Sequence, residues 1–599
     1  MRDFLVIVFL CFSSLLEGQE VTSNLVSNPI LKSERLFSKK NKTSLALPFI
    51  DDFSYNLSGV NPDLWEKSSV FVNRTYPINP ITIGVATFDG LDEYGFARNF
   101  SPSNSSEPSD TLLSQAIDLG GQSSLYFMFY FQEKGIGDAP EMQDTLVLEF
   151  LNDNFNWETI WYSNGQTMLD TVFEKVIHVI DEQKFLHSAF QFRFRNYATI
   201  SGNFDHWHLD YIKLDELLSI SDTAELNDVT FVYPAPSFLK RYEQMPWTHF
   251  KNNKIAEMND TAAIVLRNNE ASISVDYYYN IFENNTQIAH YPTLGVSRNE
   301  SIPTSSPTAA NFEYKNPPIS VSASVFSSLV PDNVSFIIQH VIGTGQEDNK
   351  CNDTLYYQQE FSSRFAYDDG TAESAYGINV NGAKLAYEFK LNRPDTLRAV
   401  QMYFPQMLDT VNDIDFNLTI WEKTNGVPGN TLYSQTVSPV HTENGAYHTY
   451  YITHPFQLLG TFYVGWEQTT NDLLNIGLDK NNEANQYMYY DAGAGWTLSS
   501  YPGSWMIRPI VSMEPLISNV VDIKPSFQVY PNPTSEIIII ESKTDKNHIS
   551  IFNMQGVLLK EIYSSGFITR IDITDLSPAV YFIEVSNTRD KQHQKFIIK

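Results

Sequence analysis

Short apolar stretches bounded by turn residues recur through the first part of the chain, and none of useful length has the 3.6-residue period of a helix. Aromatic and β-branched residues, which favour strands, are frequent in them. A Gly-containing turn cluster at Lys134–Asp138 separates two of the stretches. The strand candidates are residues 124–132, 145–151, 157–162, 173–180, 189–196 and 207–214. Strands at this spacing predict two packed sheets, and we expect a jelly roll.

The same pattern of short strand-like stretches separated by turn residues continues to the C-terminus. The sequence therefore predicts an all-β fold, a multidomain array of jelly-roll and Ig-like β-sandwiches. A chain of 599 residues is too long for a single core. The expected order is a signal peptide over 1–18, a flexible lead-in over 19–46, a jelly roll over 47–215, an Ig-like sandwich over 216–360, a second jelly roll over 361–513, a linker over 514–525 and a small terminal domain over 526–599.

The N-terminus predicts export. A basic start precedes an apolar run over residues 4–16, and Gly18 offers a small residue for cleavage, as in a signal peptide. Cleavage there removes Cys11 and leaves Cys351 as the single cysteine of the mature chain. A large exported chain without disulfides favours a bacterial source. No other segment is apolar enough to cross a bilayer, so we expect no transmembrane segment in the mature chain.

The C-terminal stretch has a pattern of its own. It opens with Phe527-Gln528-Val529-Tyr530-Pro531-Asn532-Pro533-Thr534. Further strand candidates are residues 537–541, 548–553, 557–562, 567–573, 580–585 and 595–598. Six or seven short strands in about 75 residues predict a small Ig-like sandwich.

Five pieces of this stretch, in order, carry a resemblance to a known family. They are Y-P-N-P-T at 530–534, I-F-N-M-Q-G-V-L-L at 551–559, I-D-I-T-D-L at 571–576, V-Y-F-I-E-V at 580–585 and K-F-I-I-K at 595–599. Together they resemble the type A sorting domain of the Bacteroidetes type IX secretion system. Ala579 departs from the family, which usually has Gly there, and we expect some turn strain.

The resemblance implies a route and a set of sorting residues. The leader takes the chain through the inner membrane, and the secretion machinery at the outer membrane then reads the terminal domain. The implied destination is the cell surface or the medium, and the implied partner is that machinery. The sorting residues assigned by the resemblance are Tyr530, Pro531, Asn532, Pro533, Gly556, Tyr581 and Lys599.

Two stretches of the first predicted jelly roll carry a second resemblance. Residues 84–92 read G-V-A-T-F-D-G-L-D, and residues 202–211 read G-N-F-D-H-W-H-L-D-Y. Both resemble jelly-roll modules of the MAM and concanavalin-like kind. The resemblance implies architecture and no particular activity.

Acidic residues near the start of each predicted jelly roll are candidate calcium ligands, because Ca²⁺ prefers carboxylate oxygens. Modules of the resembled kind often hold Ca²⁺ where the first and last strands meet. Structural calcium is the cofactor considered, and the alternative is that these acids cap turns. The candidate ligands are Asp51 or Asp52 with Asp210 in the first module, and Asp368, Asp369 and Glu373 in the second.

His206, His208 and Asp210 alternate along one predicted strand, which places them on one face about 7 Å apart. Two imidazoles and a carboxylate could bind zinc. Phe204, Ile212 and Leu214 are expected on the same face, however, which makes it largely a core face. We therefore expect histidines that are satisfied by neighbouring polar groups.

Catalytic motifs are missing from the sequence. It contains no G-x-S-x-G elbow, no H-E-x-x-H and no P-loop. A net charge of −30 repels phosphate backbones and argues against nucleic acid as a partner. A pair of glycosidase carboxylates can be neither found nor excluded among 70 acidic residues.

Aromatic side chains offer a binding chemistry, because exposed rings can stack on sugars, although most aromatics in a sandwich belong to its core. Candidates are Trp157, Trp161 and Tyr162 in one module and Tyr487, Tyr489, Tyr490 and Trp496 in the other. We expect an exported, non-enzymatic, adhesin-like protein that binds surface glycans or proteins. The alternative is an extracellular polysaccharide hydrolase with unidentified catalytic carboxylates.

Overall fold

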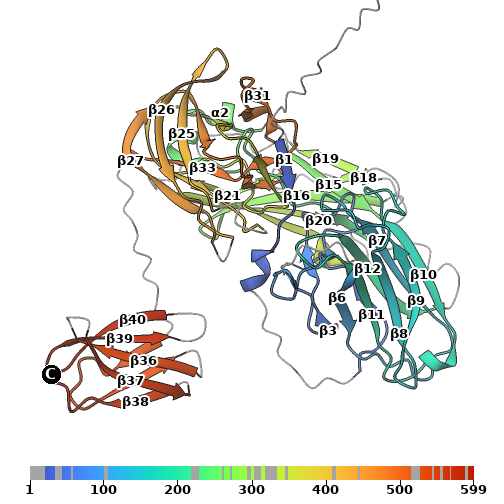
Figure 1. The fold of residues 1–599 in the computed structure, drawn as a ribbon. Coiled ribbons are helices and arrows are strands. Elements are labelled where there is room, and N and C mark those ends of the chain that lie inside the picture. Colours follow the sequence, from blue (N-terminus) through green and yellow to red (C-terminus); the bar gives the residue numbers. More distant parts are fainter. Residues whose placement is uncertain are drawn as a thin grey trace, which may run out of the picture. The chain divides into compact units, whose positions relative to one another are not determined.

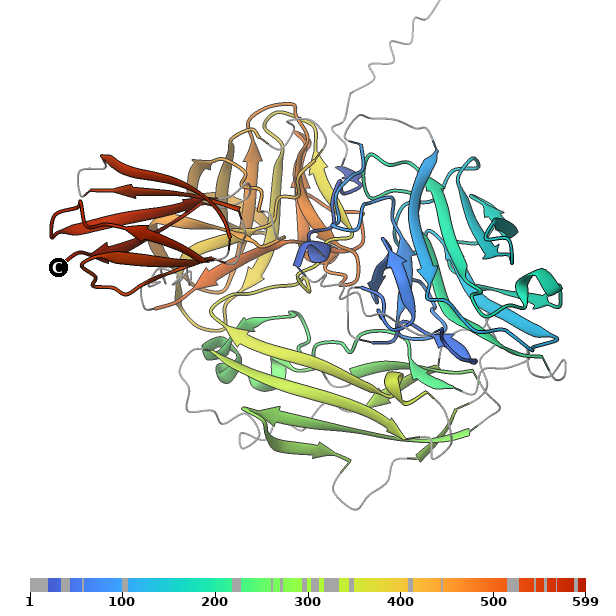
Figure 2. The same cartoon turned by 90° about the horizontal axis from the view of Figure 1, so that it is seen from below.

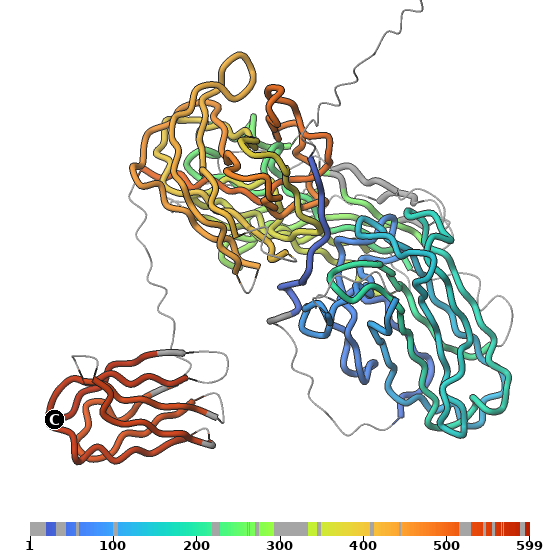
Figure 3. The backbone as a smooth tube through the Cα atoms, viewed as in Figure 1, coloured from blue at the N-terminus to red at the C-terminus, as the bar shows by residue number. Residues whose placement is uncertain are grey.

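The computed structural model describes residues 20–33, 44–55, 59–99, 106–217, 228–259, 262–269, 273–292, 299–302, 312–316, 333–343, 349–407, 413–442, 445–513, 527–542, 546–553, 557–566, 568–586 and 591–599. The predicted all-β fold is confirmed, because nearly all regular structure is strand (Figure 1). The predicted signal peptide and linker lie outside the described residues. The chain divides into two compact units, Met1–Pro515 and Leu516–Lys599, which are described separately (Figure 3).

The first sandwich of the larger unit has two antiparallel sheets (Figure 2). One has the order β10 (Glu174–Ile180), β7 (Leu125–Glu133), β12 (Trp207–Glu216), β5 (Val85–Phe88) and β4 (Phe71–Asn73), with β2 (Phe49–Asp51) beside β12. The other has the order β3 (Trp65–Ser68), β6 (Glu107–Ser114), β11 (Phe192–Ala198), β8 (Thr145–Leu151) and β9 (Trp157–Asn164). Phe127, Phe192 and Trp207 are fully buried between the sheets. The two stretches that resemble a jelly-roll module lie side by side, because β5 pairs with β12.

Strand β12 contains a β-bulge that changes which of its side chains face the core. Its register with β7 shifts just after Asp210, and Tyr211 has a left-handed φ of 49°. An extra residue reverses the alternation of a strand, so Trp207 before the bulge and Ile212 and Leu214 after it lie in the same core. The expectation that Ile212 and Leu214 share a face with the two histidines is therefore wrong.

The second sandwich also has two sheets. One has the order β13 (Val229–Phe231), β15 (Ala262–Asn268) and β19 (Phe312–Asn316). The other has the order β14 (Met245–Pro246), β21 (Thr354–Ser362), β20 (Val334–Gly343), β16 (Ile273–Glu283) and β17 (Thr286–Tyr291), with β18 (Asn299–Ile302) beside β16. Two short helices, α1 (Trp247–Asn252) and α2 (Lys254–Glu257), follow β14. At 6 and 4 residues they are too short to leave a periodic signal in the sequence.

The third sandwich has three sheets. The first has the order β26 (Val427–Val437), β25 (Phe416–Thr424), β28 (Thr461–Gln468), β23 (Lys384–Lys390), β30 (Met488–Asp491) and β31 (Thr497–Leu498). The second has the order β27 (His448–Leu458), β24 (Asp395–Met402) and β33 (Ile507–Val511). The third has the order β1 (Glu20–Ser23), β22 (Ser374–Ile378), β29 (Leu474–Asp479) and β32 (Ser504–Trp505).

Short 3₁₀ helices occur in the connections of all three sandwiches. They are η1 (Pro29–Ser33), η2 (Gln183–Phe185), η4 (Lys350–Asn352) and η5 (Asn485–Tyr487).

The second and third sandwiches share one continuous apolar core. The rings of Tyr242 and Tyr367 lie 4.8 Å apart within it. His249 Nε2 lies 3.0 Å from Asp395 Oδ2, and both side chains are buried. These contacts cross the predicted boundary at residue 360, so the two modules pack as one body.

The N-terminal segment corrects the expectation of a flexible lead-in over residues 19–46. Residues 20–23 form β1, which pairs antiparallel with β22 and completes the edge of a sheet. The Glu20 carboxylate accepts hydrogen bonds from the Tyr376 hydroxyl at 2.5 Å and from the Ser500 N–H at 3.0 Å. Leu25 is buried, and its carbonyl accepts from the Asn203 N–H at 2.8 Å. The segment thus connects the third sandwich to the first.

The smaller unit is a two-sheet sandwich, as predicted. One sheet has the order β34 (Phe527–Tyr530), β35 (Ile537–Ser542) and β38 (Ile568–Asp572). The other has the order β37 (Leu558–Ser565), β36 (Lys546–Phe552), β39 (Val580–Ser586) and β40 (Lys591–Ile597). The apolar core between them is drawn entirely from residues of this unit. None of the described helices in either unit is long and apolar enough to cross a membrane.

Replacing Glu20 tests whether β1 is held by its side chain as well as by its backbone. The Glu20→Ala change removes the acceptor for Tyr376 and Ser500, so we expect β1 and β22 to be destabilised by about 1–3 kcal/mol. Hydrogen exchange of the amides in 20–23 and 374–378 measures the effect. Glu174→Ala, at an exposed site on β10, is the control, and equal protection in both variants would contradict the role of Glu20.

Candidate functional site

The Y-P-N-P-T piece at residues 530–534, called the sorting motif below, is hydrogen-bonded to β40, the last strand of the smaller unit. The Asn532 side-chain amide donates to the Lys595 carbonyl at 3.2 Å and accepts from the Ile597 N–H at 3.0 Å. The Asn532 side-chain amide thereby makes one donor and one acceptor bond with the backbone of β40, as the backbone of a neighbouring strand would. This contact explains why Asn532 and the final residues occur together in the motif.

An open groove of about 540 Å³ lies beside the motif. Pro531, Pro533, Arg570 and Lys599 are among its lining residues. The Lys599 N–H donates to the Thr534 carbonyl at 2.8 Å, which holds the chain terminus against the motif. The structure therefore brings three of the predicted sorting residues to one groove and adds Arg570, which the sequence did not single out.

The other predicted sorting residues have different places. Tyr530 is 37% exposed, whereas Tyr581 is buried and its hydroxyl donates to the Ser577 carbonyl at 2.7 Å. Gly556 lies outside the described residues. Ala579 is not among the non-glycine residues with a left-handed φ, so the strain expected from its side chain does not arise.

Asp51 and Asp210, from the first predicted calcium group, accept hydrogen bonds from the chain. Trp65 Nε1 donates to Asp51 at 2.6 Å. The Thr82 N–H and hydroxyl each donate to Asp210 at 2.9 Å. Burial raises the pKa of Asp51 to about 7 and raises that of Asp210 well above its usual value. These donors already satisfy the oxygens on which calcium would depend, and calcium binding here stays a prediction.

Asp52, the remaining member of that group, lies at the joint between the first and second sandwiches. Its Oδ2 accepts from Asn349 and, at 3.2 Å, from Asn352. Asn352 also donates to Asp228 at 2.9 Å. Asp52 therefore links the two modules through a residue 300 positions away in the sequence, which gives it a structural role that no local pattern could reveal.

The second predicted calcium group splits into an ion pair and a carboxylate cluster. Asp368 accepts from Arg508 Nε at 3.1 Å. The Asp369 N–H donates to Asp479 at 2.8 Å. Burial, reinforced by the charge of Asp369, raises the pKa of Glu373 to about 8. Asp479, which the sequence did not indicate, belongs to this cluster, and its pKa is raised well above the usual value by burial and by Asp369.

The two histidines before the bulge of β12 are buried and have partners from the chain. His208 Nδ1 lies 2.8 Å from the Thr87 hydroxyl, and its Nε2 lies 3.1 Å from the Lys134 carbonyl. His206 Nδ1 accepts from the Asp138 N–H at 2.9 Å. Burial lowers the pKa of His206 to about 3 and that of His208 to about 4. Both are therefore neutral at pH 7. The expected satisfaction by polar neighbours is complete only for His208, because His206 Nε2 is buried without a hydrogen-bond partner among the described residues and the His206 ring stacks on Tyr76 at 5.0 Å.

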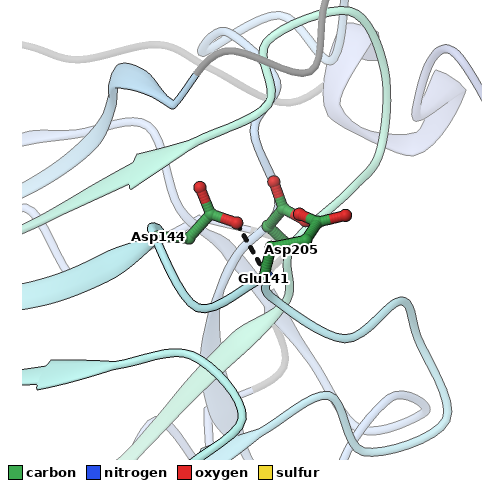
Figure 4. A group of neighbouring side chains, drawn as sticks. All are labelled: Glu141, Asp144 and Asp205. Carbon is green, nitrogen blue, oxygen red and sulfur yellow. Dashed lines mark hydrogen bonds between the residues drawn. The ribbon is translucent and has the colours of Figure 1, made fainter.

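A third group of carboxylates was not anticipated from the sequence (Figure 4). Glu141, Asp144 and Asp205 each offer one oxygen, and these atoms lie within 4.8 Å of one another. Glu141 and Asp144 lie between β7 and β8, whereas Asp205 precedes β12, so no spacing in the sequence joins them. Asp144 and Asp205 are 0% and 1% exposed, and Glu141 is exposed.

Backbone donors hold the two buried members of this group. The Glu141 N–H donates to Asp144 Oδ2 at 2.7 Å, and the Thr199 N–H donates to Asp205 Oδ2 at 2.6 Å. Burial raises the pKa of Asp144 to about 6. Burial and the charges of Asp144 and Glu141 raise the pKa of Asp205 to about 8. Burial and mutual repulsion therefore disfavour the ionised forms of Asp144 and Asp205.

The outer surface of the β3-β6-β11-β8-β9 sheet carries aromatic and charged side chains. Arg193 lies over the Trp157 ring, 4.1 Å from its centroid. Arg193 Nε and Arg195 Nε donate to one Glu149 oxygen at 2.6 Å and 2.8 Å. Tyr162 on β9 is 63% exposed. This surface is called the β9 face below.

Most of the other predicted aromatic candidates are packed. Trp161 faces the first core, 5.1 Å from Phe129. Trp496 packs edge-on against Trp421 at 5.6 Å. Arg241 covers the Tyr487 ring at 4.1 Å. Tyr489 and Tyr490 pack against apolar clusters of the third sandwich. Only part of the predicted aromatic set is therefore available to a ligand.

The terminal unit matches a known family. Residues 528–599 match the model of the secretion system C-terminal sorting domain. The chain is therefore exported to the cell surface or secreted, and the type IX secretion machinery that reads this domain is a partner. Among curated proteins, no sequence matches the chain.

Several solved structures are similar over part of the chain. The CBM22-1–GH10 modules of Clostridium thermocellum xylanase 10B are 14% identical with a TM-score of 0.19, over 30% of this chain and 30% of that one. The CBM22-1 xylan-binding domain of Paenibacillus barcinonensis Xyn10C is 9% identical with a TM-score of 0.18, over 29% and 97%. PorZ of Porphyromonas gingivalis, a surface component of the type IX secretion system, is 12% identical with a TM-score of 0.12, over 56% and 43%.

The buried cluster around Glu373 predicts a loss of stability at alkaline pH. A carboxyl group whose folded-state pKa is raised to about 8 stabilises the fold fully below its unfolded pKa and loses that contribution as pH rises towards 8. At pH 8.5 we expect the Glu373→Gln variant to have a free energy of unfolding larger than that of wild type by about 1–3 kcal/mol. At pH 5 the two should differ little. Urea denaturation measures both. Glu483→Gln, at an exposed site, is the control. A wild-type stability that does not fall between pH 5 and 8.5 would contradict the burial argument.

The last step of export should depend on the terminal unit, which has its own core and matches the sorting domain. We expect a chain without residues 526–599 to remain folded and to accumulate in the periplasm. Cell fractionation with immunoblotting measures this. Tyr563→Ser, a change at a residue that is 78% exposed, is the control. Delivery of the shortened chain outside the cell at the full-length level would show that the route is wrong.

Proposed function

We propose that this protein is an exported, non-enzymatic, adhesin-like protein that binds a glycan through the β9 face. The observation that carries the proposal is the combination of an exposed aromatic ring, Tyr162, with Trp157 held flat by Arg193 on a sheet surface. Sugar rings have apolar faces that stack on aromatic rings. Their hydroxyls need hydrogen-bonding groups held in fixed positions nearby.

Glu149 and its two arginines supply those groups. Hydrogen bonds from Arg195 and Arg193 lower the pKa of Glu149 against the opposing effect of burial, so this side chain is a carboxylate at neutral pH. Arg195 donates to both Glu149 oxygens, at 2.8 Å and 3.0 Å. Because the guanidinium groups are fixed by these bonds, their remaining N–H groups are pre-oriented towards a ligand.

The hydrolase alternative has less support. A glycosidase places two carboxyl groups on either side of a bond of the substrate, about 5–9.5 Å apart. Glu141, Asp144 and Asp205 are close together, but Asp144 and Asp205 are 0% and 1% exposed. A polysaccharide cannot reach carboxyl groups at that depth. The exposed features of the β9 face favour binding without turnover.

Truncation of the two aromatic residues tests the binding proposal. Incubation of the purified full-length chain with a glycan array identifies a ligand. We expect Trp157→Ala and Tyr162→Ala each to weaken its binding by about tenfold, since burial of an aromatic ring contributes on the order of 1–2 kcal/mol.

Tyr451→Ala is the matched control, because Tyr451 is 56% exposed on β27 and should leave binding unchanged. Isothermal titration calorimetry measures the affinities, and chromatography of the polysaccharide tests for cleavage. Release of shorter products would favour the hydrolase alternative, and equal losses in all three variants would rule out the β9 face.

A further inference from the structure

We propose that Glu141, Asp144 and Asp205 form a calcium site that joins the β7–β8 connection to the turn before β12. The site lies outside the residues that the sequence indicated as calcium ligands, and it is independent of the β9 face. In Figure 4 the three carboxyl groups lie together although they come from two separate segments of the chain. A cation between them would connect those segments directly.

The spacing of the oxygens fits calcium. The three ligand atoms lie within 4.8 Å of one another. Calcium–oxygen distances are about 2.3–2.6 Å, so two oxygens on opposite sides of the ion are separated by about 4.6–5.2 Å. Three oxygens with mutual distances up to this limit can therefore share one ion with little movement. Magnesium demands near-ideal octahedral geometry and gives up its water reluctantly, so an irregular group of three carboxylates suits it less.

An unsatisfied oxygen provides the second observation. Asp144 is 0% exposed, and its Oδ2 accepts from the Glu141 N–H. Its other oxygen, Oδ1, is buried and has no hydrogen-bond partner. A buried carboxylate oxygen without a partner costs on the order of 1–3 kcal/mol, so its presence calls for a ligand. A cation held by the group would satisfy it.

Backbone contacts hold the group in place. Asp205 adopts a left-handed φ of 58° and is fixed by the Thr199 N–H at one oxygen. Gly165 packs so tightly on the loop that an added Cβ would lie 2.2 Å from the Glu141 carbonyl. Each buried carboxylate therefore has one oxygen anchored by a backbone amide.

The ligand chemistry selects a hard cation. All three ligands are carboxylates, which suit calcium, whereas zinc prefers nitrogen and sulfur. Glu141 is exposed, so water can complete the coordination from the solvent side. With two members anchored and one exposed to solvent, an affinity in the range of extracellular calcium modules, about 10⁻⁴–10⁻³ M, is expected.

Thermal unfolding of the purified full-length chain tests the site. At pH 7.5 we expect about 5 mM Ca²⁺ to raise the unfolding temperature by about 2–3 °C over that in EGTA, and the same concentration of Mg²⁺ to raise it less. Asp144→Asn should abolish the calcium shift. In EGTA this variant should unfold at or above the wild-type temperature, because it removes carboxylate repulsion while preserving shape.

Asp181→Asn makes the same chemical change at an exposed position of the first sandwich and should retain the full shift. If Asp144→Asn does not fold, Asp205→Asn replaces it, with calcium binding measured by calorimetry. The proposal is overturned if wild type shows no calcium shift, if magnesium acts as strongly as calcium, or if the folded variant keeps the response.

Discussion

Buried polar contacts hold the first sandwich to the second, and the second and third share one apolar core. Arg267, which is fully buried, donates to two backbone carbonyls of the first sandwich at 3.1 Å. Asn352 donates to Asp52 and to Asp228. If the sandwiches separated, each of these groups that found no new hydrogen-bond partner would destabilise the protein by about 1–3 kcal/mol. The larger unit therefore behaves as one body, and its surfaces keep fixed positions relative to one another.

Local chemistry made the strands predictable. The predicted strand over 145–151 coincides with β8, because apolar and β-branched residues specify a strand wherever it packs. Strand β1 was missed because Glu20–Ser23 is polar and becomes a strand only through the free edge of β22. The bulge at Tyr211 was missed for a related reason, since register is set by the partner strands β2, β5 and β7.

The acidic residues show even more clearly that contacts between distant parts of the chain cannot be predicted from local sequence. Asp51, Asp52 and Asp210 are predicted calcium ligands, which stays a prediction, but Asp210 accepts hydrogen bonds from Thr82, which is 128 residues away. Asp144 looked ordinary in the sequence, because its neighbour Asp205 lies in a different loop. A carboxylate's role depends on the donors and charges around it, and in a β-sandwich these come from distant parts of the chain.

Separation of the sorting unit from the sandwiches has a consequence for the proposed calcium site. The sorting unit buries its own core, so that core contains no apolar residue of the cargo. The cargo carries most of a net charge of −30, and self-repulsion of that size opposes compact folding. A weak calcium site stays empty where calcium is scarce and fills where it is abundant. Such a site stabilises the first sandwich at the destination rather than before export, which suits a protein that has to be delivered before it binds.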